Sequence, residues 1–224
     1  RVRGGLPGTE KDGIIYGDVI WEITPDKQIV WEWHAKDMEI ENYPICPLCP
    51  RAEFAHANTV SPLANGDILV SFRVLNTIIL IDRETRKIKW EHKDLSFGHQ
   101  HDCHFLDNGN ILLFCNGFHG RDVDMASSVR EFNPETGDLV WEYKAKPFSS
   151  FFSANISGAQ RLWSGNTLIC EGYKGCLFEV NNEGEVVWEF VNPYLSDHPA
   201  FGTTNWIFRA FRYAPDAPQL DNLN

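Results

Sequence analysis

The stretch FGHQHDCHFLDNGNILLFCNG, residues 97–117, decides the fold. It holds three histidines within six residues, then an Asp-Asn-Gly-Asn turn, then the apolar run 111–114. An Asn-Gly pair between two apolar runs is the strongest short-range signal for a β-hairpin, because both turn residues tolerate positive φ. We therefore expect His99 and His101 to begin an inner strand that faces a central cavity, and residues 111–114 to form the next strand outward.

The same unit recurs along the chain. Four segments share a tryptophan–glutamate ending: IVWEW at 29–33, IKWEH at 88–92, LVWEY at 139–143 and VVWEF at 186–190. A Gly-containing turn recurs in LANGDILV at 63–70, LDNGNILL at 106–113 and LWSGNTLI at 162–169. Four short strands in each unit of about 40–50 residues are typical of a β-propeller blade.

The sequence thus predicts an all-β fold, a β-propeller of four-stranded blades. We expect complete blades at 53–92, 99–143 and 153–190, a half blade at 18–34, and an inner strand from the tail 205–215. In the middle blade the expected strands are 100–106, 110–116, 128–133 and 138–143, and the segments 42–52 and 117–127 are expected loop insertions. About four to five blades would leave strand edges exposed, because propellers close with about four to eight. We therefore expect residues 1–224 to be a single propeller domain with further blades upstream of Arg1.

Composition excludes some function classes. The net charge of −11 argues against a nucleic-acid partner, which needs a basic face. The chain has no run of eighteen apolar residues, so the sequence predicts no membrane span. The chain begins with Arg1, and RVRGGLPG lacks the apolar core of a signal peptide, so it reads as a processed or incomplete product.

The six cysteines are an even count, but a chain of 224 residues is too large to need disulfides to stabilise its fold. Cys46-Pro-Leu-Cys49 has zinc-ribbon spacing, but no second such pair exists. A local disulfide or two free thiols is the favoured interpretation. Cys170 and Cys176 flank a short loop and could face each other across a hairpin.

Polar residues recur at matching positions of the repeat. Seven and five residues before the landmark leucines stand His56 and Asn58, His99 and His101, and Asn155 and Ser157. Residues two apart on a strand share a face, so these side chains are expected to ring one end of a channel. Solvated polar side chains without a function are the alternative. A metal site of His99 and His101 with His56 or His104 is a further alternative, although no carboxylate or thiolate completes it.

Three more polar residues stand near expected strand ends: Arg73, Asn116 and Arg130. Arginine suits an oxyanion because its fork of donors is rigid and always charged. A surface salt bridge is the default role for either arginine.

Several segments resemble the arylsulfotransferase family, in its bacterial branch: HANTVSPLANGDILVSFR, GHQHD followed by DNGNILLFCNG, SSVREFNPETGDLVWEY, and the tail FRAFRYAP. The resemblance runs from about Tyr16 to Pro215. It implies a propeller that is commonly six-bladed and often periplasmic, so a periplasmic or secreted location is expected. It also implies sulfate transfer from an aryl sulfate to a phenolic acceptor, with no cofactor, no metal and no nucleic-acid partner, and it allows a homo-oligomer.

The resemblance implies catalytic roles for two histidines. His56 in HAN matches the first channel histidine of the family, and His101 in QHD matches the second. Both are expected to act in acid–base or anion-binding steps. The resemblance places Cys176 at the position of the histidine that carries sulfate in the family. The candidate nucleophiles are therefore His101 and Cys176.

Where the family has the arginine of a Ser-Arg pair, this chain has Ser128, so that positive charge is absent. Arg130 lies two positions on, on the same strand face, and is the expected substitute. A family aspartate falls on Cys115. The resulting substrate-binding set is Asn58, Arg73, His99, Asn116, Ser128, Arg130 and Cys176.

Three functions from different classes follow. The first is an arylsulfotransferase-like enzyme. The second is a non-catalytic propeller that serves as a binding or assembly module, favoured by the replaced arginine and histidine. The third is a metal-dependent enzyme that uses the histidine cluster, and a pyrroloquinoline quinone enzyme is a weak fourth.

Overall fold

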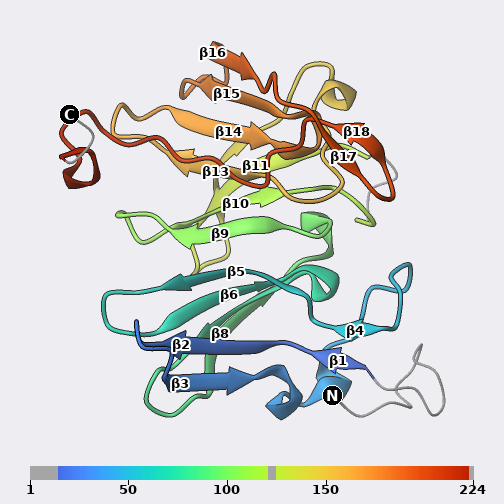
Figure 1. Ribbon diagram of the computed structural model, residues 1–224, viewed down its shortest axis with the longest axis vertical. Coiled ribbons are helices and arrows are strands. Elements are labelled where there is room, and N and C mark those ends of the chain that lie inside the picture. The colour runs from blue at the N-terminus through green and yellow to red at the C-terminus, as the bar shows by residue number, and fades with distance from the viewer. Residues whose placement is uncertain (1–14, 121–124, 222–224) are drawn as a thin grey trace. The chain divides into compact units, whose positions relative to one another are not determined.

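The computed structural model describes residues 15–120 and 125–221 (Figure 1). These residues form strands and short 3-10 turns and no α-helix. No helix in this part of the chain is long and apolar enough to cross a membrane. The fold is all-β, with antiparallel four-stranded sheets as its main elements. The chain divides into two compact units, Arg1–Leu95 and Ser96–Asn224.

The first unit contains one hairpin, one four-stranded sheet and a short parallel pair. The hairpin is β2 (Val19–Ile23) and β3 (Ile29–His34). The sheet has the order β5 (Ala57–Pro62), β6 (Ile68–Phe72), β7 (Thr77–Ile81) and β8 (Ile88–Lys93). The parallel pair is β1 (Tyr16–Gly17) with β4 (Glu53–Phe54), and the turns are η1 (Ala35–Asp37), η2 (Ile40–Asn42) and η3 (Arg73–Leu75).

The second unit contains two four-stranded sheets and a small hairpin. One sheet is β9 (His101–Phe105), β10 (Ile111–Cys115), β11 (Ser128–Phe132) and β12 (Leu139–Tyr143). The other is β13 (Gly158–Arg161), β14 (Thr167–Glu171), β15 (Cys176–Val180) and β16 (Val186–Val191). The hairpin is β17 (Ser196–His198) with β18 (Gly202–Thr204), and the turns are η4 (Leu95–Phe97), η5 (Phe148–Ser150), η6 (Gly172–Lys174) and η7 (Pro218–Leu220).

These three sheets confirm the expected blades, each a meander of sequential strands. The hairpin before the first sheet confirms the half blade. At the β9–β10 turn, Gly109 adopts φ +83° and its N–H donates to the Leu106 carbonyl at 2.9 Å. The Asn108 side chain accepts from the Asn110 N–H at 3.0 Å, which closes the turn. The Asn-Gly pair therefore closes the expected hairpin, with Gly109 and not Asn108 in the left-handed region.

Each unit has its own apolar core. In the first unit Phe54 and Phe72 are fully buried beside Trp33 of the hairpin. In the second unit Phe114 of β10 and Phe178 of β15 share one cluster, so the two sheets pack on each other. The second strand of every blade is buried along its whole length, because both faces of the sheet are covered.

Two expectations about local structure are wrong. His99 does not lie on the inner strand: it precedes β9 with φ +70°, and His56 likewise precedes β5 with φ +56°. Residues 205–215 form no strand; the tail instead meets β13 through the Gln160 side-chain amide, which accepts from the Arg212 N–H at 2.8 Å and donates to its carbonyl at 3.0 Å. Of the expected loop 117–127, residues 121–124 lie outside the described residues.

No disulfide joins any of the six cysteines, all of which lie in the described part of the chain. Cys170 pairs with Leu177 across β14 and β15, and Cys176 pairs with Glu171. The two cysteines are therefore offset by one register position and do not face each other, which corrects the expectation from their spacing.

Candidate functional site

His101 is a buried imidazole at the start of β9, 4% exposed. Its Nδ1 lies 2.8 Å from Oδ1 of Asn116 and 3.0 Å from the carbonyl oxygen of His99. Both oxygens are acceptors, which assigns the proton to Nδ1. In the neutral ring Nε2 then keeps its lone pair and can act as a nucleophile, a base or a metal ligand.

Asn116 follows β10 and is fully buried. Its Nδ2 donates to the carbonyls of Ser153 at 2.8 Å and Ile156 at 3.0 Å, while its Oδ1 faces His101. The Ser127 hydroxyl donates to the Asn116 carbonyl at 2.9 Å. Asn116 therefore orients His101 and ties it to the loop before β13, so it acts here as a positioning residue.

His56 stands at the corresponding end of the sheet in the first unit. Its Nδ1 lies 2.7 Å from Oε1 of Glu53. A carboxylate at Nδ1 orients the ring, which is the arrangement of a catalytic histidine–carboxylate dyad. The sequence pointed to His56 but missed Glu53, whose only signal was its place three residues earlier.

Two more expected residues lie at this end of the first unit. Arg73 follows β6, and its backbone N–H donates to the His56 carbonyl at 3.0 Å. Asn58 lies on β5 and accepts from the Thr59 hydroxyl at 3.3 Å. The strand pairing of Ala57 with Phe72 explains why these residues meet. That His56 and His101 face a shared axis stays a prediction.

Ser128 and Arg130 line a cavity of about 210 Å³ in the second unit. They alternate on β11, so both side chains share the face that the repeat predicted. Other side chains around the cavity are Ser96, Cys115, Lys144 and Phe148. No sequence signal marks Ser96, Lys144 or Phe148 for this cavity, because they come from three other segments and carry no shared motif.

The cavity has an excess of positive charge. Arg130 Nε lies 2.8 Å from Oε1 of Glu142, and Lys144 Nζ lies 2.9 Å from Oε2 of the same carboxylate. Arg130 also donates from its Nη1 to the Ser96 hydroxyl at 2.7 Å. Two cations share one carboxylate, so the group carries one net positive charge and favours an anion.

Cys176 does not line this cavity. Burial, followed by the carboxylates of Glu189 and Glu171, raises the pKa of the Cys176 thiol to about 11. A thiol with this pKa is almost entirely protonated at neutral pH, and the thiolate is the nucleophilic form. The local electrostatics therefore favour His101 over Cys176 as a nucleophile.

Asp102 is a buried carboxylate next to His101 in the chain. Its Oδ1 lies 3.1 Å from Nε of Arg209, and its Oδ2 accepts from the Ala159 N–H at 3.1 Å. Burial raises the pKa of Asp102, and the Arg209 cation opposes this shift. The bonds join β9 to β13 and to the tail, so Asp102 has a structural role.

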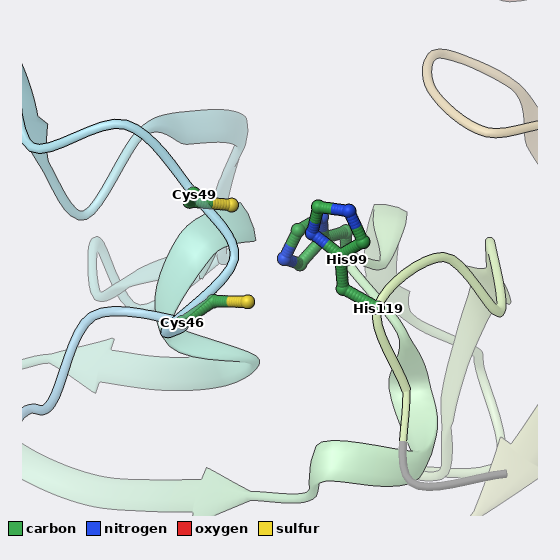
Figure 2. A group of neighbouring side chains, drawn as sticks. All are labelled: Cys46, Cys49, His99 and His119. Atoms are coloured by element: carbon green, nitrogen blue, oxygen red, sulfur yellow. The ribbon is translucent and has the colours of Figure 1, made fainter. Parts of the chain in front are cut away.

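Each unit also contains a pair of side chains of the kinds that bind metals (Figure 2). In the first unit Cys46 and Cys49 lie on one loop, and their sulfur atoms point the same way. In the second unit the rings of His99 and His119 lie side by side, with centroids 5.0 Å apart. The alternative metal site of His99 and His101 with His104 is not formed among the described residues, and His104 Nδ1 instead bonds to the carbonyl of Asp102 at 3.1 Å.

Comparison with known proteins gives one family. The family model for arylsulfotransferase matches residues 4–193. No curated protein sequence matches the chain.

Solved structures with similar folds are propeller-like proteins. A catalytically inactive virginiamycin B lyase from Staphylococcus aureus with quinupristin matches with a TM-score of 0.50 and 16% identity, over 79% of this chain and 49% of that one. A streptogramin B lyase matches with a TM-score of 0.48 and 13% identity, over 79% and 48%. BamB from Moraxella catarrhalis matches with a TM-score of 0.44 and 15% identity, over 80% and 46%. The chain thus spans about half the length of these proteins, and the first of them supports the β-propeller fold.

Proposed function

Because the chain belongs to the arylsulfotransferase family, we propose that it moves a sulfuryl group from an aryl sulfate to a phenolic acceptor. The observation that carries the proposal is the buried imidazole of His101, whose Nδ1 is held by Asn116 and by the His99 carbonyl. A fixed tautomer presents one defined nitrogen lone pair, which attack on sulfur requires.

Transfer would proceed in two steps. First, the Nε2 lone pair of His101 attacks sulfur, the bond from sulfur to the aryl oxygen breaks, and the phenolate leaves with the electron pair. Then the acceptor phenol loses its proton, its oxygen attacks sulfur, and the N–S bond breaks to restore the imidazole. His56 is the proposed acid–base residue: it gives a proton to the departing phenolate in the first step and takes the proton of the acceptor phenol in the second, while Glu53 at Nδ1 orients its ring.

Positive charge must balance the sulfuryl oxygens as the leaving bond breaks. Ser128 leaves the family's arginine position uncharged, so we propose that Arg130 and Lys144 supply this charge in the second unit. Phe148 lines the same cavity and is half exposed, which suits contact with an aromatic ring. Arg73, Asn58 and His99 stay proposed substrate contacts.

A non-catalytic binding module is the second candidate. Two observations favour it: Ser128 stands where the family has arginine, and Cys176, at the family's sulfate-acceptor position, has a raised thiol pKa. This candidate predicts binding of aryl sulfates in the cationic cavity without turnover. In either case the family supports a periplasmic or secreted location and small-molecule partners, and homo-oligomerisation stays open.

The test is acceptor-dependent transfer by the purified chain. An aryl sulfate with a coloured phenolate is mixed with a second phenol, and both phenolate release and the sulfated acceptor are measured. His101→Ala is expected to reduce transfer by about 10²–10⁴-fold, and Asn116→Ala is expected to reduce it less, because it removes only the orientation of the ring.

His104→Ala is the matched control, since His104 lies on the same strand and bonds only a backbone carbonyl among the contacts described. It is expected to retain transfer. Full transfer by a folded His101→Ala variant would reject the proposed role. Saturable binding of the aryl sulfate with no sulfated acceptor would replace the enzyme by the binding module.

A further inference from the structure

The second unit contains a larger cavity at the opposite end of β9 from His101. Its volume is about 690 Å³, and Phe105, the last residue of β9, lines it. His101 is the first residue of that strand, so at about 3.4 Å per residue the two ends lie about 14 Å apart. The volume is within the range of small-molecule sites, about 300–1,000 Å³. This cavity shares no lining residue with the one around Arg130 and is therefore a separate place on the second unit.

Two exposed aromatic side chains line this cavity. Trp163 comes from the β13–β14 turn and is 56% exposed, and Phe211 comes from the tail and is 55% exposed. Neither belongs to the buried core cluster of the second unit, so neither is explained by packing of the blades. Large aromatic surfaces that meet water at a cavity favour contact with a ligand that has an apolar face.

A buried polar network lines the same cavity. Glu131 accepts from Nδ2 of Asn108 at 3.0 Å and from Nη2 of Arg161 at 2.8 Å. Nε of Arg161 is buried and has no hydrogen-bond partner among the described residues. An unpaired buried donor is costly, so this N–H favours a ligand that brings an oxygen acceptor.

The charges at this cavity differ from those around Arg130. Arg161 is the one lysine or arginine among the described residues that line it, and Glu131 forms an ion pair with it. Asp107 adds an exposed carboxylate, so the lining does not favour an anion such as a sulfate ester. The exposed amide of Asn182 can both donate and accept, and the Asp107 carboxylate can accept from hydroxyl groups.

We propose that this cavity binds a neutral carbohydrate. A sugar ring has an apolar C–H face, which contacts Trp163 and Phe211, and a rim of hydroxyl groups. The hydroxyl groups bond to Asp107 and Asn182, and a sugar oxygen accepts from Nε of Arg161. The role is binding and not catalysis, because none of the residues proposed for sulfate transfer lines this cavity.

The test uses the whole chain on an array of immobilised glycans that holds neutral cello-, manno- and galacto-oligosaccharides together with sulfated and sialylated glycans. We expect binding to a neutral oligosaccharide, which titration calorimetry then measures in solution. Trp163→Ala and Phe211→Ala are each expected to weaken that binding about three- to tenfold, because each removes one aromatic contact with the sugar ring.

The chain offers a matched control for each variant. Trp21→Ala removes a tryptophan that is 57% exposed in the first unit, and Phe208→Ala removes a phenylalanine that is 57% exposed in the same tail. Both should bind the sugar as the wild type does, and circular dichroism checks that all four variants fold. A wild-type chain that binds no neutral glycan, or only sulfated or sialylated ones, would overturn the proposal. Unchanged affinity in both Trp163→Ala and Phe211→Ala would overturn it as well. Sulfate transfer is not a readout, so failure of the proposed function would leave this result unchanged.

Discussion

At the scale of single residues, Asp67 shows how one position of the repeat changes its chemistry. Asn110, at the same position of the next blade, donates to Glu131 at 2.7 Å. In the first blade Leu80 occupies the position that corresponds to Glu131, so no glutamate is present there. Asp67 instead forms an ion pair with Lys89. It also accepts from the Arg83 N–H at 3.2 Å. These bonds, with that of Lys89 the strongest, lower the pKa of the Asp67 carboxyl.

This lowered pKa predicts a pH dependence of stability. Because the folded-state pKa lies below the ordinary value of about 3.9, the carboxylate stabilises the fold above that value, and this contribution is lost as pH falls through the folded-state pKa. Asp67→Asn should therefore lower the urea midpoint at pH 7, with a smaller difference from wild type at pH 3. Glu135→Gln, in an exposed turn, is the control. An equal difference at both pH values would contradict the assignment.

At the scale of elements, the repeated tryptophan joins neighbouring blades within each unit. Trp31 of β3 donates its Nε1–H to the Arg83 carbonyl at 2.9 Å, and Trp141 of β12 donates to the Asn182 carbonyl at 3.3 Å. Both acceptors lie two residues after the third strand of the following sheet. An arginine covers each indole, Arg83 over Trp31 and Arg161 over Trp141.

Removing the indole N–H should therefore weaken blade packing. Trp31→Phe and Trp141→Phe each lose a hydrogen bond and weaken a cation–π contact, with an expected cost of about 1–3 kcal/mol. The larger loss is expected at Trp31, which is 5% exposed and has the shorter bond. Trp163→Phe is the control, since Trp163 is 56% exposed. Denaturant unfolding followed by circular dichroism measures the three variants, and equal midpoints would refute this role.

At the scale of the whole molecule, β16 leaves apolar side chains exposed. Val187, Trp188 and Phe190 are 53%, 39% and 42% exposed, and β16 has β15 as its one neighbour in the sheet. An apolar edge strand of this kind promotes pairing with another chain. We expect the chain to self-associate with rising concentration in sedimentation velocity, and Val187→Lys/Phe190→Lys to reduce this. Glu183→Lys/Glu185→Lys adds the same two lysines in the neighbouring turn as a control. A monomer at all concentrations would contradict the expectation.

The sequence by itself determined the four strands of each complete blade, the turns that join them and the phase of the blades. These features depend on interactions between neighbours in the chain: the left-handed conformation at Gly109, the apolar run Ile111–Cys115, and the tryptophan–glutamate ending of each blade. Local interactions can be read from short windows, which is why the three sheets and the half blade appear at the expected residues.

Only the tertiary structure decided which side chains meet. Glu53 at His56, Asn116 at His101, and Lys144 with Phe148 beside Arg130 come from separate segments with no shared motif. The alternation of side chains along a strand predicted that His99 lies on the inner strand. Its backbone is instead left-handed, and its ring contacts the ring of His119. A site depends on distances between atoms far apart in sequence, and a periodic pattern carries the order of residues but not those distances.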